Sequence, residues 1–243
     1  SFRWRKCACV VEFLVRKRNK LLEYLQGCMD GRILWLDSVR ITQADICAYY
    51  AKSDGAMEKR TYHWFCLGLS LAQLLGLPNG EGFLRALEDL CVEAHTGFST
   101  SSYLPSWKGM MAKMEMVGGA VGGALIGGVV GGEFSKKPTR LLLQPLGTAL
   151  DYFEVAYTLL QMLPLVYLKL TDDASATAQG FAIVLQGDKL LKKYVFSPLS
   201  KDLNSIGQQI LQKQVSQLDV LFSDLRDTAV VGEQEDDWLS VGV

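Results

Sequence analysis

Residues 116–132 read Met-Val-Gly-Gly-Ala-Val-Gly-Gly-Ala-Leu-Ile-Gly-Gly-Val-Val-Gly-Gly, with no charge between Glu115 and Glu133. The glycines of this stretch recur at intervals of four, and they are Gly118, Gly119, Gly122, Gly123, Gly127, Gly128, Gly131 and Gly132. Residues four apart share one face of a helix. Each glycine costs about 1 kcal/mol relative to Ala in an exposed helix, and close backbone packing, as between membrane helices, offsets that cost. The stretch therefore predicts a glycine-zipper helix that meets a membrane or another helix.

The zipper is short for a membrane span. At 1.5 Å per residue it covers about 26 Å, against a hydrocarbon core of about 30 Å. A second apolar region, residues 141–170, is interrupted by Pro145, Gly147 and Pro164. We expect the two regions together to form a hairpin that dips into or crosses a bilayer, with local thinning closing the gap in length.

The 243 residues are 49% hydrophobic and carry a net charge of only -1, but the charge is unevenly distributed. Residues 1–20 contain seven basic residues and one acidic residue, whereas residues 216–243 contain seven acidic residues and one basic residue. The basic end would meet an anionic membrane surface, or it is an ordinary solvated helix face. The six cysteines form no ligand pattern and favour a reduced, intracellular setting. Because the chain begins at Ser1, we expect a fragment or a processed form.

Apolar periodicity predicts an all-α fold, a helical bundle with a glycine-zipper, membrane-associated helical hairpin. Arg18 interrupts the apolar stripe of the first helix. Thr42 and Asp45 predict the capped start of another, and breaks are expected at Gly187 and Ser197-Pro198. The expected helices span residues 7–26, 43–52, 56–76, 81–95, 171–185 and 200–226, with an extended or short helical segment at 32–41 and basic amphipathic turns at 188–196.

The main boundary is expected in the Ser/Thr-rich stretch between residues 97 and 106. The predicted units are a helical region at 1–97, the zipper and apolar helices at 106–196, an amphipathic helix at 197–231 and a disordered acidic tail at 232–243. The amphipathic helix is typical of a packing or pairing element.

No catalytic pattern is present in the sequence, and we expect neither an enzyme nor a cofactor, a metal or a nucleic-acid partner. His63 and His95 are interpreted as packed or helix-capping residues. A small basic cluster follows the zipper, and it would bind lipid headgroups or form an ordinary polar turn: Lys136, Lys137 and Arg140.

The order of features in residues 118–195 resembles the glycine-zipper protein family of mitochondrial membrane protein-associated neurodegeneration. The zipper is followed by Glu133-Phe134-Ser135-Lys136-Lys137-Pro138, an apolar segment at 141–146, Tyr152-Phe153-Glu154, Leu170-Thr171-Asp172-Asp173 and a helix ending at Leu190-Leu191. The Gly run here is shorter and lacks the proline at the turn of the family's hairpin. The resemblance implies a non-enzymatic membrane protein of mitochondria or endoplasmic reticulum, with a cytosolic pool, that takes part in lipid homeostasis.

Three functional hypotheses remain open from the sequence. The first is a membrane-associated protein whose partners are lipids and a second copy bound through the glycine stripe. The second is a soluble helical interaction module in which the glycine-rich helix is buried. The third is an oligomeric pore-forming protein.

Overall fold

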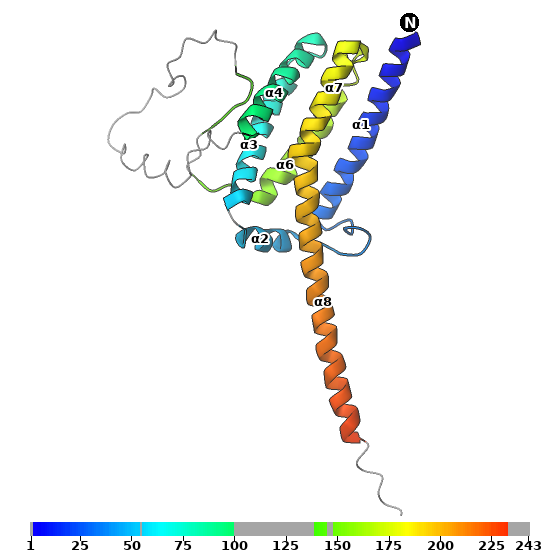
Figure 1. The fold of residues 1–243 in the computed structure, drawn as a ribbon, viewed down its shortest axis with the longest axis vertical. Helices are drawn as coiled ribbons and strands as arrows, with labels where there is room; N and C mark the ends of the chain where they lie inside the picture. Colours follow the sequence, from blue (N-terminus) through cyan, green and yellow to red (C-terminus); the bar gives the residue numbers. More distant parts are fainter. Residues whose placement is uncertain (1, 54, 100–138, 145–147, 233–243) are drawn as a thin grey trace, which may run out of the picture.

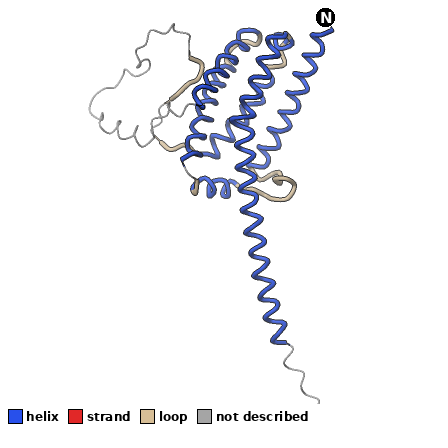
Figure 2. Tube along the Cα trace, viewed as in Figure 1, coloured by secondary structure: helices blue, strands red, loops and turns tan. Residues whose placement is uncertain are grey.

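The computed structural model describes residues 2–53, 55–99, 139–144 and 148–232. This part of the chain is all helical, as Figure 2 shows, and its only β-type pairing is an isolated bridge between Trp35 and Val39. The all-α class predicted from apolar periodicity is confirmed for these residues. The glycine zipper lies outside them.

The bundle is organised around one interior helix, α6 (Tyr152–Lys169). The helices of the first half are α1 (Phe2–Met29), α2 (Gln43–Ala51), α3 (Gly55–Leu75) and α4 (Glu81–Ser99), and those of the second half are α6 (Tyr152–Lys169), α7 (Ala178–Leu191) and α8 (Ser197–Gly232). Helix α6 packs against α3, α1 and α2, and α4 packs against α7. In Figure 1, α7 lies between α1 and α4, and α8 runs out of the bundle as a long single helix.

Buried apolar side chains from both halves form one core. Trp64 and Leu67 of α3 belong to the same cluster as Leu160 and Leu163 of α6, and Leu22 of α1 joins them. Helices on both sides of the boundary expected at residues 97–106 therefore share this core. The apolar region around Val155–Leu168, expected to pair with the zipper, buries most of one face inside the bundle.

Side-chain caps fix where several helices begin. Thr42 and Asp45 form a reciprocal capping box at α2, as the sequence predicts. Asp151 accepts the backbone N–H of Glu154 at the start of α6. The helix expected from residue 171 instead begins as a short 3-10 turn, Asp173–Ala176, and α7 follows after Thr177 as its cap.

The chain remains helical through the breaks expected at Gly187 and Pro198. Helix α7 continues through a π-helical turn, Lys192–Phe196, into α8. Gly187 faces Leu87 of α4, and an added Cβ would lie 3.5 Å from Leu87 Cδ2, an ordinary van der Waals contact. Pro198 has no N–H to give to the carbonyl four residues earlier. Trp64 Nε1 donates to that carbonyl, Tyr194 O, at 2.6 Å.

The segment expected to be extended or helical at 32–41 is a tight turn. Trp35 N donates to Val39 O at 2.7 Å, and Leu36 and Asp37 have φ angles of 50° and 53°. The turn buries Trp35 against Gly207, near the point where α8 leaves the bundle.

Candidate membrane-facing site

Most residues singled out for membrane contact lie outside the described part of the chain. This applies to all eight zipper glycines and to Lys136 and Lys137. Arg140 and the residues just after it are described. The structure therefore shows where the glycine-rich segment is attached to the bundle.

The attachment point is a set of hydrogen bonds from α3 and α4. Glu93 Oε2 accepts the backbone N–H groups of Arg140 and Leu141, each at 2.7 Å. Ser70 Oγ accepts the N–H of Leu142 at 2.9 Å and donates to Cys66 O within its own helix. These contacts hold the returning chain against the bundle. Sequence reasoning missed Glu93 and Ser70, because each reads as an ordinary helical residue.

The described residues on either side of residues 100–138 meet at this point. Leu141 is buried against the last turns of α4, and its Cδ2 would lie 3.1 Å from a Cβ placed on Gly97. A larger residue at 97 would crowd Leu141. Residues 139–142 thus lie beside the end of α4 and beside α3.

Arg140 is half-buried against this attachment point. Its backbone is held by Glu93, and its Nε is buried without a hydrogen-bond partner among the described residues. A lipid-binding guanidinium needs access to headgroups, so the placement of Arg140 differs from that of an exposed cation. Of the three residues of the predicted basic cluster, this is the only one whose surroundings the structure describes.

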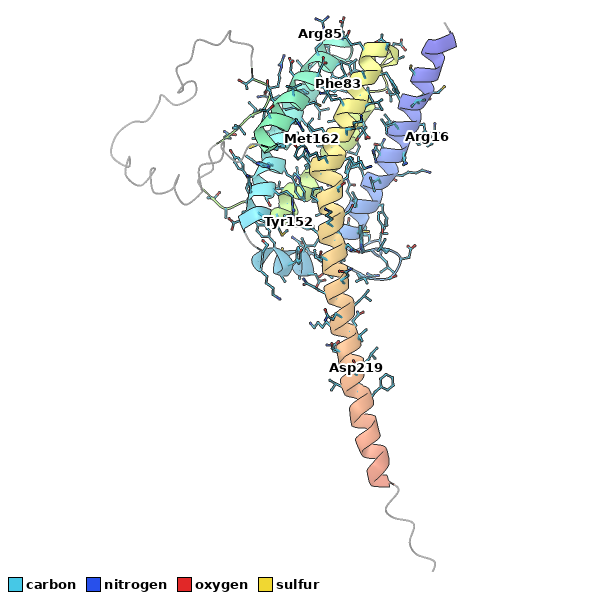
Figure 3. All side chains as sticks on the ribbon, in the orientation of Figure 1. Arg16, Phe83, Arg85, Tyr152, Met162 and Asp219 are labelled. Carbon is cyan, nitrogen blue, oxygen red and sulfur yellow. The ribbon has the colours of Figure 1, made fainter. Side chains whose placement is uncertain are left out.

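Helix α1 presents a second surface, which we call the basic face. Val10 and Phe13 are 47% and 65% exposed, although their neighbour Val11 is buried. Arg16, Lys17 and Lys20 follow Phe13 at helical spacing and are exposed. Arg16 points away from the bundle in Figure 3. Apolar side chains bordered by cations are typical of a helix that lies on an anionic bilayer surface.

Two buried groups of Arg, Asp and Tyr join the helices. In the first, Arg18 Nε and Nη2 donate to the two carboxylate oxygens of Asp188 at 2.6 and 2.7 Å, and Tyr167 OH donates to Asp188 Oδ1 at 2.8 Å. The hydrogen bond to Asp188 raises the pKa of Arg18, and burial raises the pKa of Tyr167. The Arg18 that interrupts the apolar stripe of α1 therefore has a buried counterion on α7.

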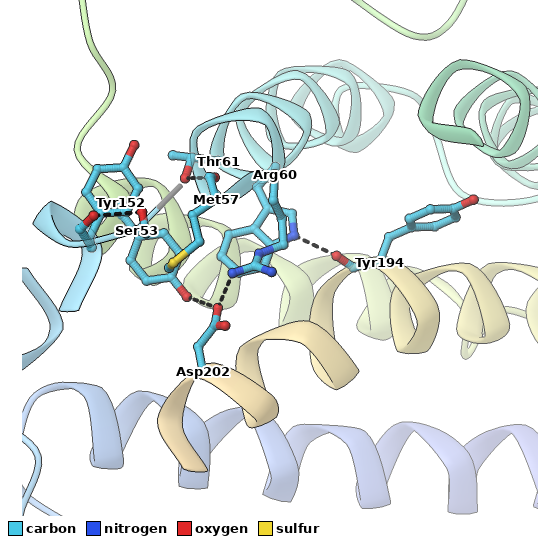
Figure 4. Close-up of polar contacts among 9 residues, drawn as sticks. Ser53, Met57, Arg60, Thr61, Tyr152, Tyr194 and Asp202 are labelled. Atoms are coloured by element: carbon cyan, nitrogen blue, oxygen red, sulfur yellow. Dashed lines mark hydrogen bonds and ion pairs between the residues drawn. The ribbon is translucent and has the colours of Figure 1, made fainter. Parts of the chain in front are cut away.

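The second group, drawn in Figure 4, has the same composition. Arg60 Nη2 and Tyr152 OH both donate to Asp202 Oδ2, at 2.5 and 2.6 Å. Burial raises the pKa of Asp202, against the opposing effects of Tyr152 and Arg60. Each group links three helices, and in the second group Arg60 Nε is buried without a hydrogen-bond partner among the described residues. Links between three helices favour a structural role.

The interior offers little space for a small molecule beside these groups. A cavity of about 10 Å³ lies between α3, α4, α6 and α7, next to Tyr167 and Asp188. That volume accommodates no more than about one water molecule. Within the described ranges, no group of three or more His, Cys, Asp and Glu side chains is placed to hold a metal ion.

The histidines contact aromatic residues, and half of the cysteines are buried. His63 stacks on Phe98 with ring centroids 4.3 Å apart, and burial, reinforced by Lys59, lowers its pKa to about 4. His95 Nδ1 lies 3.3 Å from Tyr194 OH. All six cysteines are free thiols, and three of them are buried, Cys28, Cys66 and Cys91.

The described helices do not include one that is both long and apolar enough to cross a membrane. Comparison of the chain with protein-family models, curated proteins and solved structures finds no match.

Proposed function

We propose that this chain is a non-enzymatic, membrane-associated protein in which a helical bundle carries the glycine-rich segment as an inserted hairpin. The observation that carries the proposal is the closeness of Gly97 and Leu141, which lie on either side of residues 100–138 in the sequence. A lone crossing between Gly97 and Leu141 would separate these two residues by the bilayer core, about 30 Å. Because they lie side by side, a segment inserted between them would return to the side from which it entered.

The length and composition of residues 116–132 agree with this topology. A charge-free, 17-residue stretch is too short for a comfortable crossing but suits a shallow or paired insertion. The glycine stripe gives a surface on which a second helix or a second copy would pack closely. The resemblance in residues 118–195 favours membranes of the mitochondrion or endoplasmic reticulum and a role in lipid homeostasis.

The basic face of α1 supplies a further lipid contact in this proposal. Phe13 would enter the headgroup region while Arg16, Lys17 and Lys20 meet anionic lipids. In Figure 1, α1 lies across the bundle from α3 and α4, which hold the attachment point. The basic face is therefore a separate surface, and its contribution is measured separately.

The experiment replaces residues 104–134 with a short Gly/Ser linker and compares this variant with the full chain by alkaline carbonate extraction of cell membranes. Because Gly97 and Leu141 lie side by side, a short linker can join α4 to residue 139, and the variant is expected to keep the helical circular dichroism of the bundle. It should be released into the soluble fraction, whereas the full chain stays in the pellet. Full release of the unaltered chain would contradict the insertion.

A matched pair of charge reversals tests the basic face in vesicle flotation. Each basic residue near an anionic surface contributes about 1 kcal/mol, so Lys17→Glu, which removes a cation and adds an anion, should weaken binding roughly thirtyfold at low salt. Lys213→Glu, an exposed lysine on α8, is the control and should have little effect. Equal binding of all three chains to anionic vesicles would remove the basic face from the proposal.

A second candidate function is a soluble helical interaction module, and the exposed apolar residues of α8 favour it. A chain that stays monodisperse without detergent and does not bind vesicles would support this candidate over the first. A pore-forming oligomer is a variant of the first candidate, and it requires leakage of dye from vesicles.

A further inference from the structure

The outer part of α8 carries an apolar stripe with no neighbour in the bundle. From Leu211 to Phe222 every side chain is exposed, and Figure 1 shows this part projecting far beyond the other helices. Four large apolar residues lie at intervals of four, three and four, and they are 42%, 55%, 51% and 62% exposed: Leu211, Val215, Leu218 and Phe222. The sequence continues the same spacing at Leu225 and Ala229. This alternation is the heptad pattern of a coiled coil.

The stripe is not a continuation of the face that packs into the bundle. That inner face is formed by Leu199, Leu203, Ile206 and Ile210, also spaced by four and three. The outer stripe begins at Leu211, one residue later, and is therefore rotated by about 100° around the helix. A helix that bound the stripe would approach from a direction that the bundle leaves open.

The charges around the stripe distinguish between a membrane, a charged partner and a second copy of the chain as its binding partner. The positions beside the stripe are Gln212, Gln214, Asp219 and the exposed Leu221, and Lys213 lies on the far side of the helix. Residues 216–243 hold seven acidic residues and one basic residue, so an anionic bilayer would repel this end of the chain. Neutral glutamines at the flanks give no attraction to a strongly charged partner and little repulsion between identical helices.

We propose that two copies of this chain pair through the outer part of α8, with Leu211, Val215, Leu218 and Phe222 forming the seam of a two-stranded coiled coil. From Leu211 to Ala229 the seam would be about 27 Å long. Most helices in proteins owe their stability to packing of an apolar face, so pairing would stabilise this part of α8. The inference does not depend on the membrane proposal, because the stripe and the glycine-rich segment are different surfaces.

The test is the mass of the full chain, measured by light scattering across micromolar concentrations, in mild detergent if buffer alone does not keep it dispersed. The unaltered chain should approach twice its 26.9 kDa. The variant L218K/F222K should remain at the monomer mass. The matched control is Val220→Lys, because Val220 is 60% exposed but lies on the other side of the helix from Leu218. The control should dimerise like the unaltered chain.

Three results would overturn the inference. One is a monomeric unaltered chain over the whole concentration range. Another is a dimer that persists in L218K/F222K, which would place pairing elsewhere, for instance on the glycine stripe if Gly123→Leu then dissociates it. The third is equal loss of the dimer in Val220→Lys. Helical circular dichroism of each variant shows that the bundle has folded.

Discussion

Replacing Arg18 by Met should destabilise the bundle strongly, because the substitution leaves a buried carboxylate without its counterion. Arg18 and Asp188 are joined by two hydrogen bonds of 2.6 and 2.7 Å, and their side chains are only 14% and 11% exposed. Breaking a buried pair by removing one partner costs about 3–5 kcal/mol. The remaining exposure and the Tyr167 hydroxyl place the expected loss near the lower end, about 3 kcal/mol.

The double variant R18M/D188L separates the ion pair from simple loss of packing. Replacing both partners by apolar groups of similar size removes the uncompensated charge, and such replacements are often close to neutral. The Tyr167 hydroxyl then lacks its acceptor, which costs about 1–3 kcal/mol. We therefore expect the double variant to be no less stable than Arg18→Met, with a coupling energy of about 2 kcal/mol.

The assay is urea unfolding followed by circular dichroism of the helices. Arg85→Met is the control, because its pair with Glu81 is 67% and 70% exposed and is expected to contribute no more than about 0.5 kcal/mol. A loss for Arg18→Met within 1 kcal/mol of the control would refute the reasoning. Additive losses in the double variant would refute it as well.

Two further predictions concern single positions in the bundle. Gly180→Ala should lower the free energy of unfolding in urea by about 2 kcal/mol or more, because a Cβ there would lie 2.1 Å from the backbone oxygen of Ala174. The control Gly82→Ala has open space around it and should stabilise α4 by up to about 1 kcal/mol. Equal effects of the two substitutions would contradict the packing described at Gly180. His63 has a folded pKa of about 4 against 6.5 unfolded, so the unfolded chain binds the proton first and stability should fall as the pH drops from 6.5 towards 4. Allowing for partial exposure, the unaltered chain should lose roughly 1–2 kcal/mol more than His63→Gln between pH 7 and pH 5, and parallel pH profiles would exclude this role.

Local chemistry made several elements of the fold predictable. The capping box at Thr42 depends on residues three apart, and the structure has it as predicted. The predicted helices at 43–52, 56–76 and 81–95 match α2, α3 and α4 to within a few residues. The amphipathic helix at 200–226 also lies within α8, because its apolar spacing is regular.

Tertiary contacts determine what the sequence alone did not reveal. Gly187 and Pro198 are normally helix-breaking residues, yet the helix continues through both. At Pro198, the Trp64 indole donates a hydrogen bond to the carbonyl that the proline leaves without its N–H partner. In the sequence, Arg18 only interrupts an apolar stripe. Its role depends on Asp188, 170 residues away in the sequence, which the fold places beside it.

In the candidate site, too, some features are visible in the sequence and others depend on tertiary contacts. The zipper glycines and the lysines after them are visible as a pattern, and their membrane role stays a prediction because they lie outside the described residues. The attachment by Glu93 and the meeting of Gly97 with Leu141 depend on folding and have no local signal.

The central claim is that the glycine-rich segment enters a membrane and returns to the same side. Its most direct test is alkaline carbonate extraction of the full chain beside the chain in which residues 104–134 are a short linker. The account predicts that the full chain stays with the membrane, while the linker variant is released as a folded helical protein. Release of both chains, or retention of both, would contradict it.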